Sequence, residues 1–442
     1  MLTRIGKAVD MQGAAVKIKE AVYPNPFESG LEYTPPARGT WNIVHTNMLV
    51  PESHQVYICA AGCLRGVVLT AAEMGAMDRF SSILVEEHNL MDGSMENLII
   101  DGVGDILDRL PRRPKVMFIY PACIHRFMGC DMSAVYVQLQ RRYPDIGFGE
   151  CYMDPIMRKS GLTAEARTRW QLYHFLTPQE HDWKSVNIIG NNLPTSEDSE
   201  LVRLIKDNGF ILRDLTLCRT YEEYLEMGKS AVNISYNPQM IYGGQQMEKS
   251  LGQKNIYIPL SFDCLEIRNE LYQLADFLGV QHLDYSPNML QCERSLAKAK
   301  DVIGDTAIAL DYAVTFRPFS LARLLLDHGF NVTRMYVDTI PSEDKADFEY
   351  LQQCYPNLML YATVHAKMRV MDRYTTEPLL AIGQKAAYFT GTRHFVDIAE
   401  CGGFYGFTGI SHMAARMVEA FLEEKDARDY IQIKGWRCRT CR

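Results

Sequence analysis

Several motifs that would assign an activity directly are missing from this sequence. It has no GxxxxGK[ST] phosphate-binding loop, so we expect that the chain neither binds nor hydrolyses a nucleotide. It also has no GxGxxG after a strand-like run, which would bind a dinucleotide, and no GxSxG turn of a serine hydrolase. If the protein carries out redox chemistry, its electrons must therefore come from a partner.

Long apolar runs and an excess of basic charge are missing too. No window approaches the roughly 18 apolar residues that a membrane span needs, and the first residues lack the apolar stretch of a signal peptide. We therefore expect a soluble, cytoplasmic protein that does not bind a membrane. The chain has 46 basic and 54 acidic residues and a net charge of −8, without a basic cluster. This balance predicts that nucleic acid is not a partner.

Cysteine, in contrast, is abundant: the chain has 12. In a reducing compartment, thiols bind metals or are buried rather than forming a disulfide framework. Cys59 and Cys63 lie in "YICAAGCLRG", and Cys123 and Cys130 lie in "YPACIHRFMGCDM", after an apolar run that predicts a buried strand. Four thiolates at loop positions suit an iron–sulfur cluster, although a single cysteine is often only a small buried hydrophobe. His125 could donate a hydrogen bond to a cluster sulfur or lie at the surface.

A further pair, Cys438 and Cys441, forms a CxxC motif in "RCRTCR". Structural zinc would normally show two such motifs. The flanking arginines favour an exposed basic tail.

An internal repeat gives the clearest architectural signal. Near residue 186 the chain reads "VNIIG", then "SELVRLIKDNGF" and "ILRDLTL"; near residue 306 it reads "TAIAL", then "LARLLLDHGF" and "NVTRMYV". Each copy predicts a strand, a helix ended by a glycine (Gly209 or Gly329) and a second strand. This βαβ order predicts parallel sheets.

We therefore predict an α/β protein with three Rossmann-like, flavodoxin-like domains. The predicted segments are an N-terminal arm with a cluster-binding α/β domain (1–183), a second α/β domain (184–300), a third α/β domain (301–395), and a glycine-rich turn, helix and tail (396–442). Within the first segment, the proline-rich residues 24–54 predict an irregular arm.

Over nearly its whole length the chain resembles the nitrogenase component 1 type of oxidoreductase. Family members have a cysteine after a strand and then a glycine with two aspartates; here Cys123 is followed at the same distance by Gly129-Cys130-Asp131. "AAGCLRG" resembles the family's glycine-cysteine turn, which implies that Cys63 is a cluster ligand. "LMDGSMENL" and "CGGFYGFTG" are similar to two further family segments.

The departures from the family pattern are informative. The earlier ligand cysteine of the family has no counterpart near Ala37, so Cys59 and Cys130 are candidates to replace it. The segment "QCERSLAKAK" is similar to the helix start that supplies a thiolate to the nitrogenase active-site cofactor, which makes Cys292 a candidate cofactor ligand. His394 is out of register with the histidine that holds that cofactor. This argues against dinitrogen reduction and favours a simpler cluster.

The resemblance implies the iron–sulfur subunit of a nitrogenase-like reductase, with its domains around a central cleft that binds a small-molecule substrate. It implies a 4Fe–4S or larger cluster at a subunit interface, electrons from a separate ATP-dependent iron protein, and assembly with a homologous second subunit or with itself as a dimer or tetramer. The 22 methionines and 12 cysteines suit an anaerobic setting.

Two alternatives remain open at this level. One is a scaffold or carrier that assembles a metal cluster without turnover of a substrate. The other is a regulatory or ligand-binding α/β protein whose thiols only pack in the core.

Overall fold

The computed structural model describes residues 11–33, 35, 41–153, 162–373 and 377–426. The chain forms two compact units. The first unit comprises Asn42–Pro194 and Gly209–Tyr257, and the second comprises Met1–Trp41, Thr195–Asn208 and Ile258–Arg442. The described strands form two four-stranded sheets in the first unit and one six-stranded sheet in the second.

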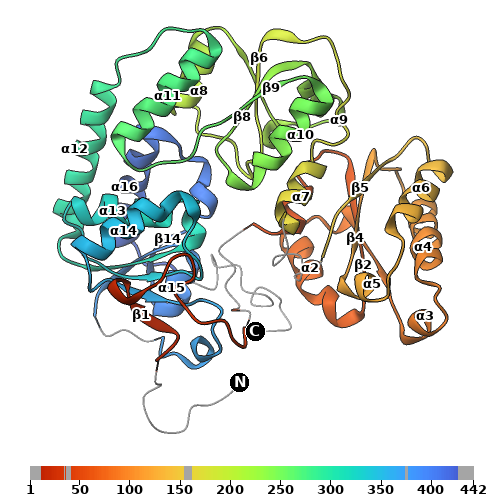
Figure 1. Cartoon of the computed structure of the whole chain (residues 1–442), viewed down its shortest axis with the longest axis horizontal. Coiled ribbons are helices and arrows are strands. Elements are labelled where there is room, and N and C mark those ends of the chain that lie inside the picture. The colour runs from red at the N-terminus through yellow and green to blue at the C-terminus, as the bar shows by residue number, and fades with distance from the viewer. Residues whose placement is uncertain (1–10, 34, 36–40, 154–161, 374–376, 427–442) are drawn as a thin grey trace. The chain divides into compact units, whose positions relative to one another are not determined.

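The first sheet of the first unit is entirely parallel and has the order β3-β2-β4-β5 (Figure 1). Its strands are β2 (Ser53–Cys59), β3 (Phe80–Leu84), β4 (Val116–Pro121) and β5 (Gly147–Glu150). The two central strands, β2 and β4, are buried along their whole length. Continuous burial is expected where helices cover both faces of a parallel sheet.

The helices around this sheet are α1 (Ile43–Asn47), α2 (Ala61–Glu73), α3 (Glu87–Met91), α4 (Met95–Arg109), α5 (Cys123–Phe127) and α6 (Met132–Arg142). Successive residues of a strand point to opposite faces, so β2 contributes to two separate groups of core residues. Tyr57 packs in the group that contains Val67 of α2. Val56 packs in the group that contains Ile99 of α4 and Val135 of α6. The helix α2 therefore lies on one face of the sheet, and α4 and α6 lie on the other.

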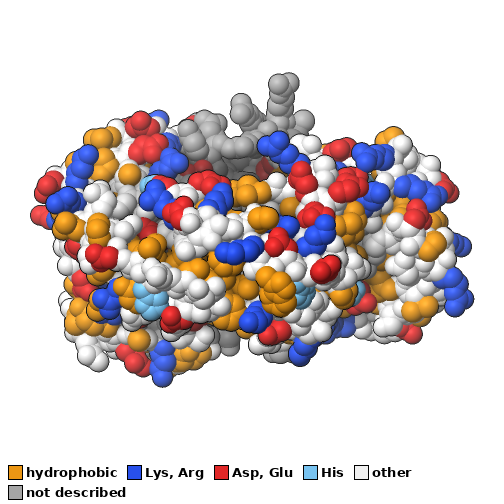
Figure 2. Space-filling model, turned by 90° about the horizontal axis from the view of Figure 1, so that it is seen from above, with side chains coloured by type: hydrophobic (Ala, Val, Ile, Leu, Met, Phe, Trp, Pro, Cys, Tyr) orange, Lys and Arg blue, Asp and Glu red, His pale blue; other side chains and the backbone are white. Residues whose placement is uncertain are grey.

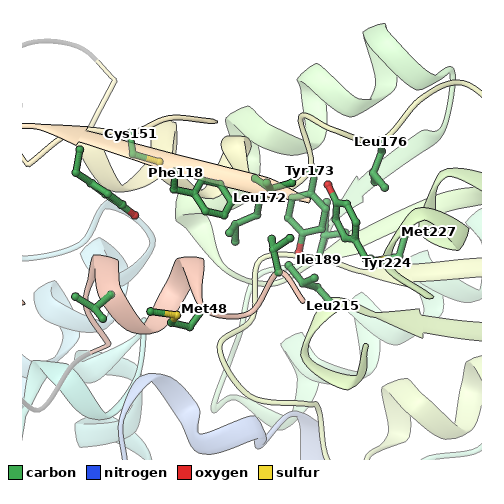
Figure 3. Packing of buried hydrophobic residues seen from close by; sticks show 14 of the residues in the cluster. Met48, Phe118, Cys151, Leu172, Tyr173, Leu176, Ile189, Leu215, Tyr224 and Met227 are labelled. Atoms are coloured by element: carbon green, nitrogen blue, oxygen red, sulfur yellow. The ribbon is translucent and has the colours of Figure 1, made fainter. Parts of the chain in front are cut away.

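The second sheet of the first unit is also parallel, with the order β7-β6-β8-β9. Its strands are β6 (Asp182–Ile188), β7 (Ile211–Asp214), β8 (Ser230–Ser235) and β9 (Lys254–Tyr257), and the neighbouring helices are α7 (Ala164–Gln171), α9 (Tyr221–Leu225) and α10 (Ile241–Leu251). Figure 3 shows that Phe118 of β4 lies in the same group of buried side chains as Tyr173, Ile189 and Leu215. The two sheets of this unit thus share one hydrophobic core.

The second unit is built on a six-stranded sheet with the order β1-β12-β11-β10-β13-β14. Its strands are β1 (Ala15–Lys17), β10 (Ala307–Asp311), β11 (Val332–Tyr336), β12 (Met359–Tyr361), β13 (Leu379–Ile382) and β14 (His394–Val396). Only the edge strand β1 runs antiparallel to its neighbour. The helices of this unit are α8 (Glu200–Asp207), α11 (Cys264–Leu278), α12 (Ser286–Ile303), α13 (Pro318–Asp327), α14 (Lys345–Cys354), α15 (Gln384–Thr390) and α16 (Gly406–Leu422).

The predicted repeat is present at both places in the chain. β6, α8 and β7 follow one another in the first copy, and β10, α13 and β11 do so in the second; both strand pairs are parallel. Gly209 and Gly329 come after the two helices with φ of 76° and 78°. Only glycine adopts this left-handed conformation without a steric cost. The predicted fold class, α/β with three groups of parallel strands, is confirmed.

The division into segments 1–183, 184–300, 301–395 and 396–442 stays a prediction. The short strand β1 joins the sheet whose other strands lie between residues 307 and 396. Within the predicted irregular arm, the structure has the helix α1 and the start of β2. The helix α1 begins there because the Asn42 side-chain oxygen accepts hydrogen bonds from the N–H groups of Val44 (2.9 Å) and His45 (3.3 Å).

Charged side chains of both signs are interspersed over the face shown in Figure 2. Some form local ion pairs, such as Arg109 with Asp105 one helical turn away on α4, at 2.8 Å. In the part of the chain that the structure describes, no helix combines the length and the apolar character needed to cross a membrane.

Candidate functional site

Three of the predicted cysteines come together at the carboxyl ends of β2 and β4. These strands are neighbours, with Tyr57 opposite Tyr120 and Ile58 opposite Pro121. Cys59 is the last residue of β2, and Cys123 begins α5 just after β4. Cys63 lies in the first turn of α2. We call Cys59, Cys63 and Cys123 the thiol edge.

The backbone fixes the positions of these thiols. The Ala122 N–H donates a hydrogen bond to the Ile58 carbonyl at 3.1 Å, which ties the exit of β4 to the end of β2. The Cys63 N–H donates to the Ala60 carbonyl at 2.9 Å, in the turn that opens α2. Cys63 and Cys123 thus each lie where a strand passes into a helix.

The three thiols differ in exposure and interact electrostatically. Cys59 is completely buried, Cys123 is partly exposed and Cys63 is exposed. Burial, reinforced by the neighbouring thiols of Cys63 and Cys123, raises the pKa of Cys59 to about 12. The raised pKa favours the neutral thiol at Cys59, and a bound metal would favour its thiolate, because a coordinating thiol loses its proton.

Cys130 is not brought to the thiol edge. It packs with Ile124 and Met132 against the group of buried residues on the α4 and α6 face, whereas α2 covers the opposite face. Burial raises the pKa of Cys130, and Glu96 adds to that effect. The Cys130 backbone N–H donates to the His125 carbonyl at 3.0 Å, in the turn that ends α5.

His125 is buried, with 2% of its surface exposed, so the surface position considered from the sequence is wrong. Its Nδ1 lies 3.1 Å from the Ala122 carbonyl. Because a carbonyl only accepts, Nδ1 carries the proton. Nε2 is then an acceptor, and it has no hydrogen-bond partner among the described residues. Burial lowers the pKa of His125, which favours this neutral form over one that donates to sulfur.

Cys292 lies in the second unit and is completely buried in α12. The influence of Cys264, which begins α11, raises the pKa of Cys292, and burial adds to that effect. No motif in the sequence points to Cys264. The only local signal was an aspartate directly before it, which caps the helix. The role that the resemblance implies for Cys292, a ligand of a second metal cofactor, stays a prediction.

The thiol edge fits an iron–sulfur cluster by the chemistry of its donors, which are three soft sulfur ligands at one sheet edge. Among the described residues, no group of three or more His, Cys, Asp or Glu side chains, the thiol edge included, is arranged closely enough to hold a metal ion. Cys438 and Cys441 lie outside the described residues.

Comparison with known proteins identifies the family. A family model described as nitrogenase component 1 type oxidoreductase matches residues 49–422. The chain belongs to this family. The predicted resemblance is therefore confirmed.

The chain is also similar to a curated protein of cofactor biosynthesis. The nitrogenase iron-molybdenum cofactor biosynthesis protein NifE of Clostridium pasteurianum is 26% identical over 221 residues, which is 48% of this chain and 46% of the relative. The chain thus matches less than half the length of that curated relative.

Solved nitrogenase structures share the fold. Nitrogenase Cp1 at pH 6.5 superimposes with a TM-score of 0.63 at 13% identity, over 91% of this chain and 95% of the other. Nitrogenase Cp1 at pH 5 gives a TM-score of 0.58 at 14% identity, over 92% and 94% of the two chains. At this level of identity the likeness establishes the architecture alone.

Proposed function

We propose that this chain is the iron–sulfur subunit of a nitrogenase-like reductase, and that the thiol edge holds the cluster. The observation that carries the proposal is the grouping of Cys59, Cys63 and Cys123 at one sheet edge in a member of this family. Such a cluster, when bound, would relay low-potential electrons from a separate ATP-dependent iron protein to a small-molecule substrate.

The three cysteines of the thiol edge have different roles in this proposal. Cys63 and Cys123 supply two sulfur ligands from the beginnings of α2 and α5. Cys59 supplies a third sulfur from a completely buried position, where water is excluded. Exclusion of water and hydrogen bonds to sulfur set the potential of a cluster.

A second subunit is the proposed source of the fourth ligand. The sequence pointed to Cys130 for that place, but Cys130 packs on the other face of the sheet. Exposed apolar side chains lie on β3, beside β2, and at the end of α5: Leu84 pairs with Cys59 in the sheet and is 46% exposed, and Phe127 (68%) and Met128 (47%) follow Cys123 in the chain. We call Leu84, Phe127 and Met128 the apolar rim. Exposed apolar groups at one edge are typical of a protein interface.

Iron analysis of cysteine variants tests the proposal. The full-length chain, prepared anaerobically together with its partner and reconstituted with iron and sulfide, should be brown, with about four iron atoms per cluster. We expect Cys63→Ser and Cys123→Ser to lose most of this iron, because each removes a ligand. Cys130→Ser and the matched control Cys354→Ser, an exposed cysteine of α14, should keep it. Colourless wild-type protein, or equal iron in all four variants, would rule the proposal out.

A scaffold for metal-cluster assembly is the second candidate function. It is favoured by the similarity to a cofactor biosynthesis protein. A scaffold would use the same thiols as a reductase, so a test for turnover of a substrate is needed to distinguish the two functions. A reductase consumes ATP through the iron protein and reduces substrate, whereas a scaffold passes its iron and sulfide to an acceptor protein without ATP-dependent reduction.

A further inference from the structure

The second unit contains a pocket of about 220 Å³ that is lined by residues of α11, α12, α13 and α14. No cysteine of the thiol edge lines this pocket. Its apolar lining consists of Phe262, Leu265 and Leu324. Sites for drug-sized ligands have volumes of about 300–1,000 Å³, so this pocket suits a smaller molecule.

Two side chains of α13 bring unused hydrogen-bond donors to the pocket. Ser320 is 3% exposed, and its oxygen accepts a hydrogen bond from the Phe262 N–H at 3.4 Å. The Ser320 O–H has no acceptor among the described residues. Arg323 donates from Nη1 to Asp347 at 3.0 Å, and its Nη2 donates to no described residue. Because a buried donor without a partner costs free energy, these groups favour a ligand that accepts hydrogen bonds.

Two carboxylates that line the pocket each keep one unused oxygen. Asp263 caps α11 through Oδ1 alone, which accepts hydrogen bonds from the N–H groups of Leu265 (2.8 Å) and Glu266 (3.1 Å). Glu293 contacts His328 through Oε2 alone, at 2.9 Å. In the described part of the chain, Oδ2 of Asp263 and Oε1 of Glu293 form no hydrogen bond. These two oxygens favour a ligand that donates hydrogen bonds and carries positive charge.

The other two carboxylates of the pocket are already paired. Asp347 accepts a hydrogen bond from Arg317 at 2.9 Å through one oxygen and from Arg323 through the other. Asp327 accepts hydrogen bonds from two tyrosines, at 3.0 and 2.9 Å. No group of His, Cys, Asp or Glu side chains among the described residues is arranged to hold a metal ion. The groups left for a ligand are therefore two donors and two acceptors, and a simple cation or a simple anion would satisfy only one kind.

We propose that this pocket binds a free α-amino acid with an apolar side chain. The carboxylate of the amino acid accepts hydrogen bonds from Ser320 and Arg323. Its ammonium group donates to Asp263 and Glu293, and its side chain packs on the apolar lining. The pocket and the thiol edge share no residue, so this proposal does not rest on the proposed iron–sulfur function.

Isothermal titration calorimetry of the full-length wild-type chain tests the proposal with L-leucine and two analogues. One analogue, 4-methylpentanoate, lacks the ammonium group, and the other, 3-methylbutylamine, lacks the carboxylate. We expect leucine to bind at least about tenfold more tightly than either, because each analogue loses hydrogen bonds to a charged group. The proposal is overturned if millimolar leucine gives no heat of binding, or if either analogue binds as tightly as leucine.

Variants and a thiol probe locate the binding site. Glu293→Gln should weaken leucine binding at least about tenfold, because it removes the charge that faces the ammonium group. Glu349→Gln makes the same change at a half-exposed position of α14 that does not line the pocket, and it should bind leucine like wild type. Equal affinities of these two variants would contradict the assigned pocket.

The thiol probe needs no variant. Cys264 is partly exposed and lines the pocket, so saturating leucine should slow its alkylation by iodoacetamide. The exposed Cys354, which does not line the pocket, should react at the same rate with and without leucine. Mass spectrometry of the digested chain measures both rates. An unchanged rate at Cys264 would show that leucine binds elsewhere and would overturn the proposal.

Discussion

Glu270 shows how one buried residue makes stability depend on pH. It lies on α11 and is 8% exposed. Burial raises its pKa from 4.5 to about 8; repulsion from Glu266 adds to this, and Arg317 opposes it. Between these two pH values the folded chain therefore holds a proton that the unfolded chain has released. The stability linked to this proton is complete below pH 4.5 and is lost as the pH rises through about 8.

Glu270→Gln should remove this pH dependence, because the amide is neutral at every pH. Wild type should lose stability as the pH rises from about 5 to about 9, and the variant should not lose this part. The unfolding free energy of the variant minus that of wild type should therefore grow by on the order of 3 kcal/mol over this range, since a tenfold change in proton affinity is worth about 1.4 kcal/mol. Urea unfolding of wild type and variant at both pH values measures this difference in unfolding free energy. Glu349→Gln, at a half-exposed position on α14, is the control. Parallel profiles for wild type and Glu270→Gln would contradict the assignment.

At the scale of one element, the glycine after α13 contributes to stability through its backbone conformation. Gly329 has φ of 78°, and a Cβ atom added there would meet only the Lys300 side chain at 3.8 Å, which is an ordinary contact. Gly329→Ala should therefore cost about 1 kcal/mol of unfolding free energy through backbone strain alone. Gly62 in α2 has helical backbone and no neighbour within 4 Å of such a Cβ atom. Gly62→Ala should accordingly stabilise the chain by up to about 1 kcal/mol.

Denaturant unfolding of the two alanine variants measures whether each substitution lowers or raises the unfolding free energy. A loss for Gly62→Ala or a gain for Gly329→Ala would contradict these backbone conformations. Gly329 follows the helix of the second copy of the repeat, so its result tests how that helix ends.

At the scale of the whole molecule, the apolar rim predicts an assembly. Phe127→Asp places a charge on a side chain that is 68% exposed beside the thiol edge. We expect it to weaken association with the second subunit or second copy at least tenfold, because an interface core disfavours an unpaired charge. Light scattering after size-exclusion chromatography of the iron-loaded assembly measures the mass.

The matched control for the assembly is Val137→Asp on α6. Val137 is an apolar residue of the same unit with 61% exposure. This variant should assemble like wild type. Equal assembly of Phe127→Asp and Val137→Asp would show that the partner does not cover the apolar rim.

The sequence by itself determined much of this protein. The spacing of apolar residues and the positions of Gly209 and Gly329 specify strands, helices and their parallel order, because these patterns depend on local conformation and on which face of an element is buried. The family motifs around Cys63 and Cys123 could be recognised for a similar reason: each motif is a short continuous stretch where a strand passes into a helix.

Only the tertiary structure decided which thiols meet. Cys59 joins Cys63 and Cys123 because β2 and β4 are neighbours in the sheet, whereas Cys130 is carried to the opposite face by the turn after α5. Strand order and helix packing bring together residues that are distant in the sequence, and these contacts arise from burial of the whole core rather than from any single segment.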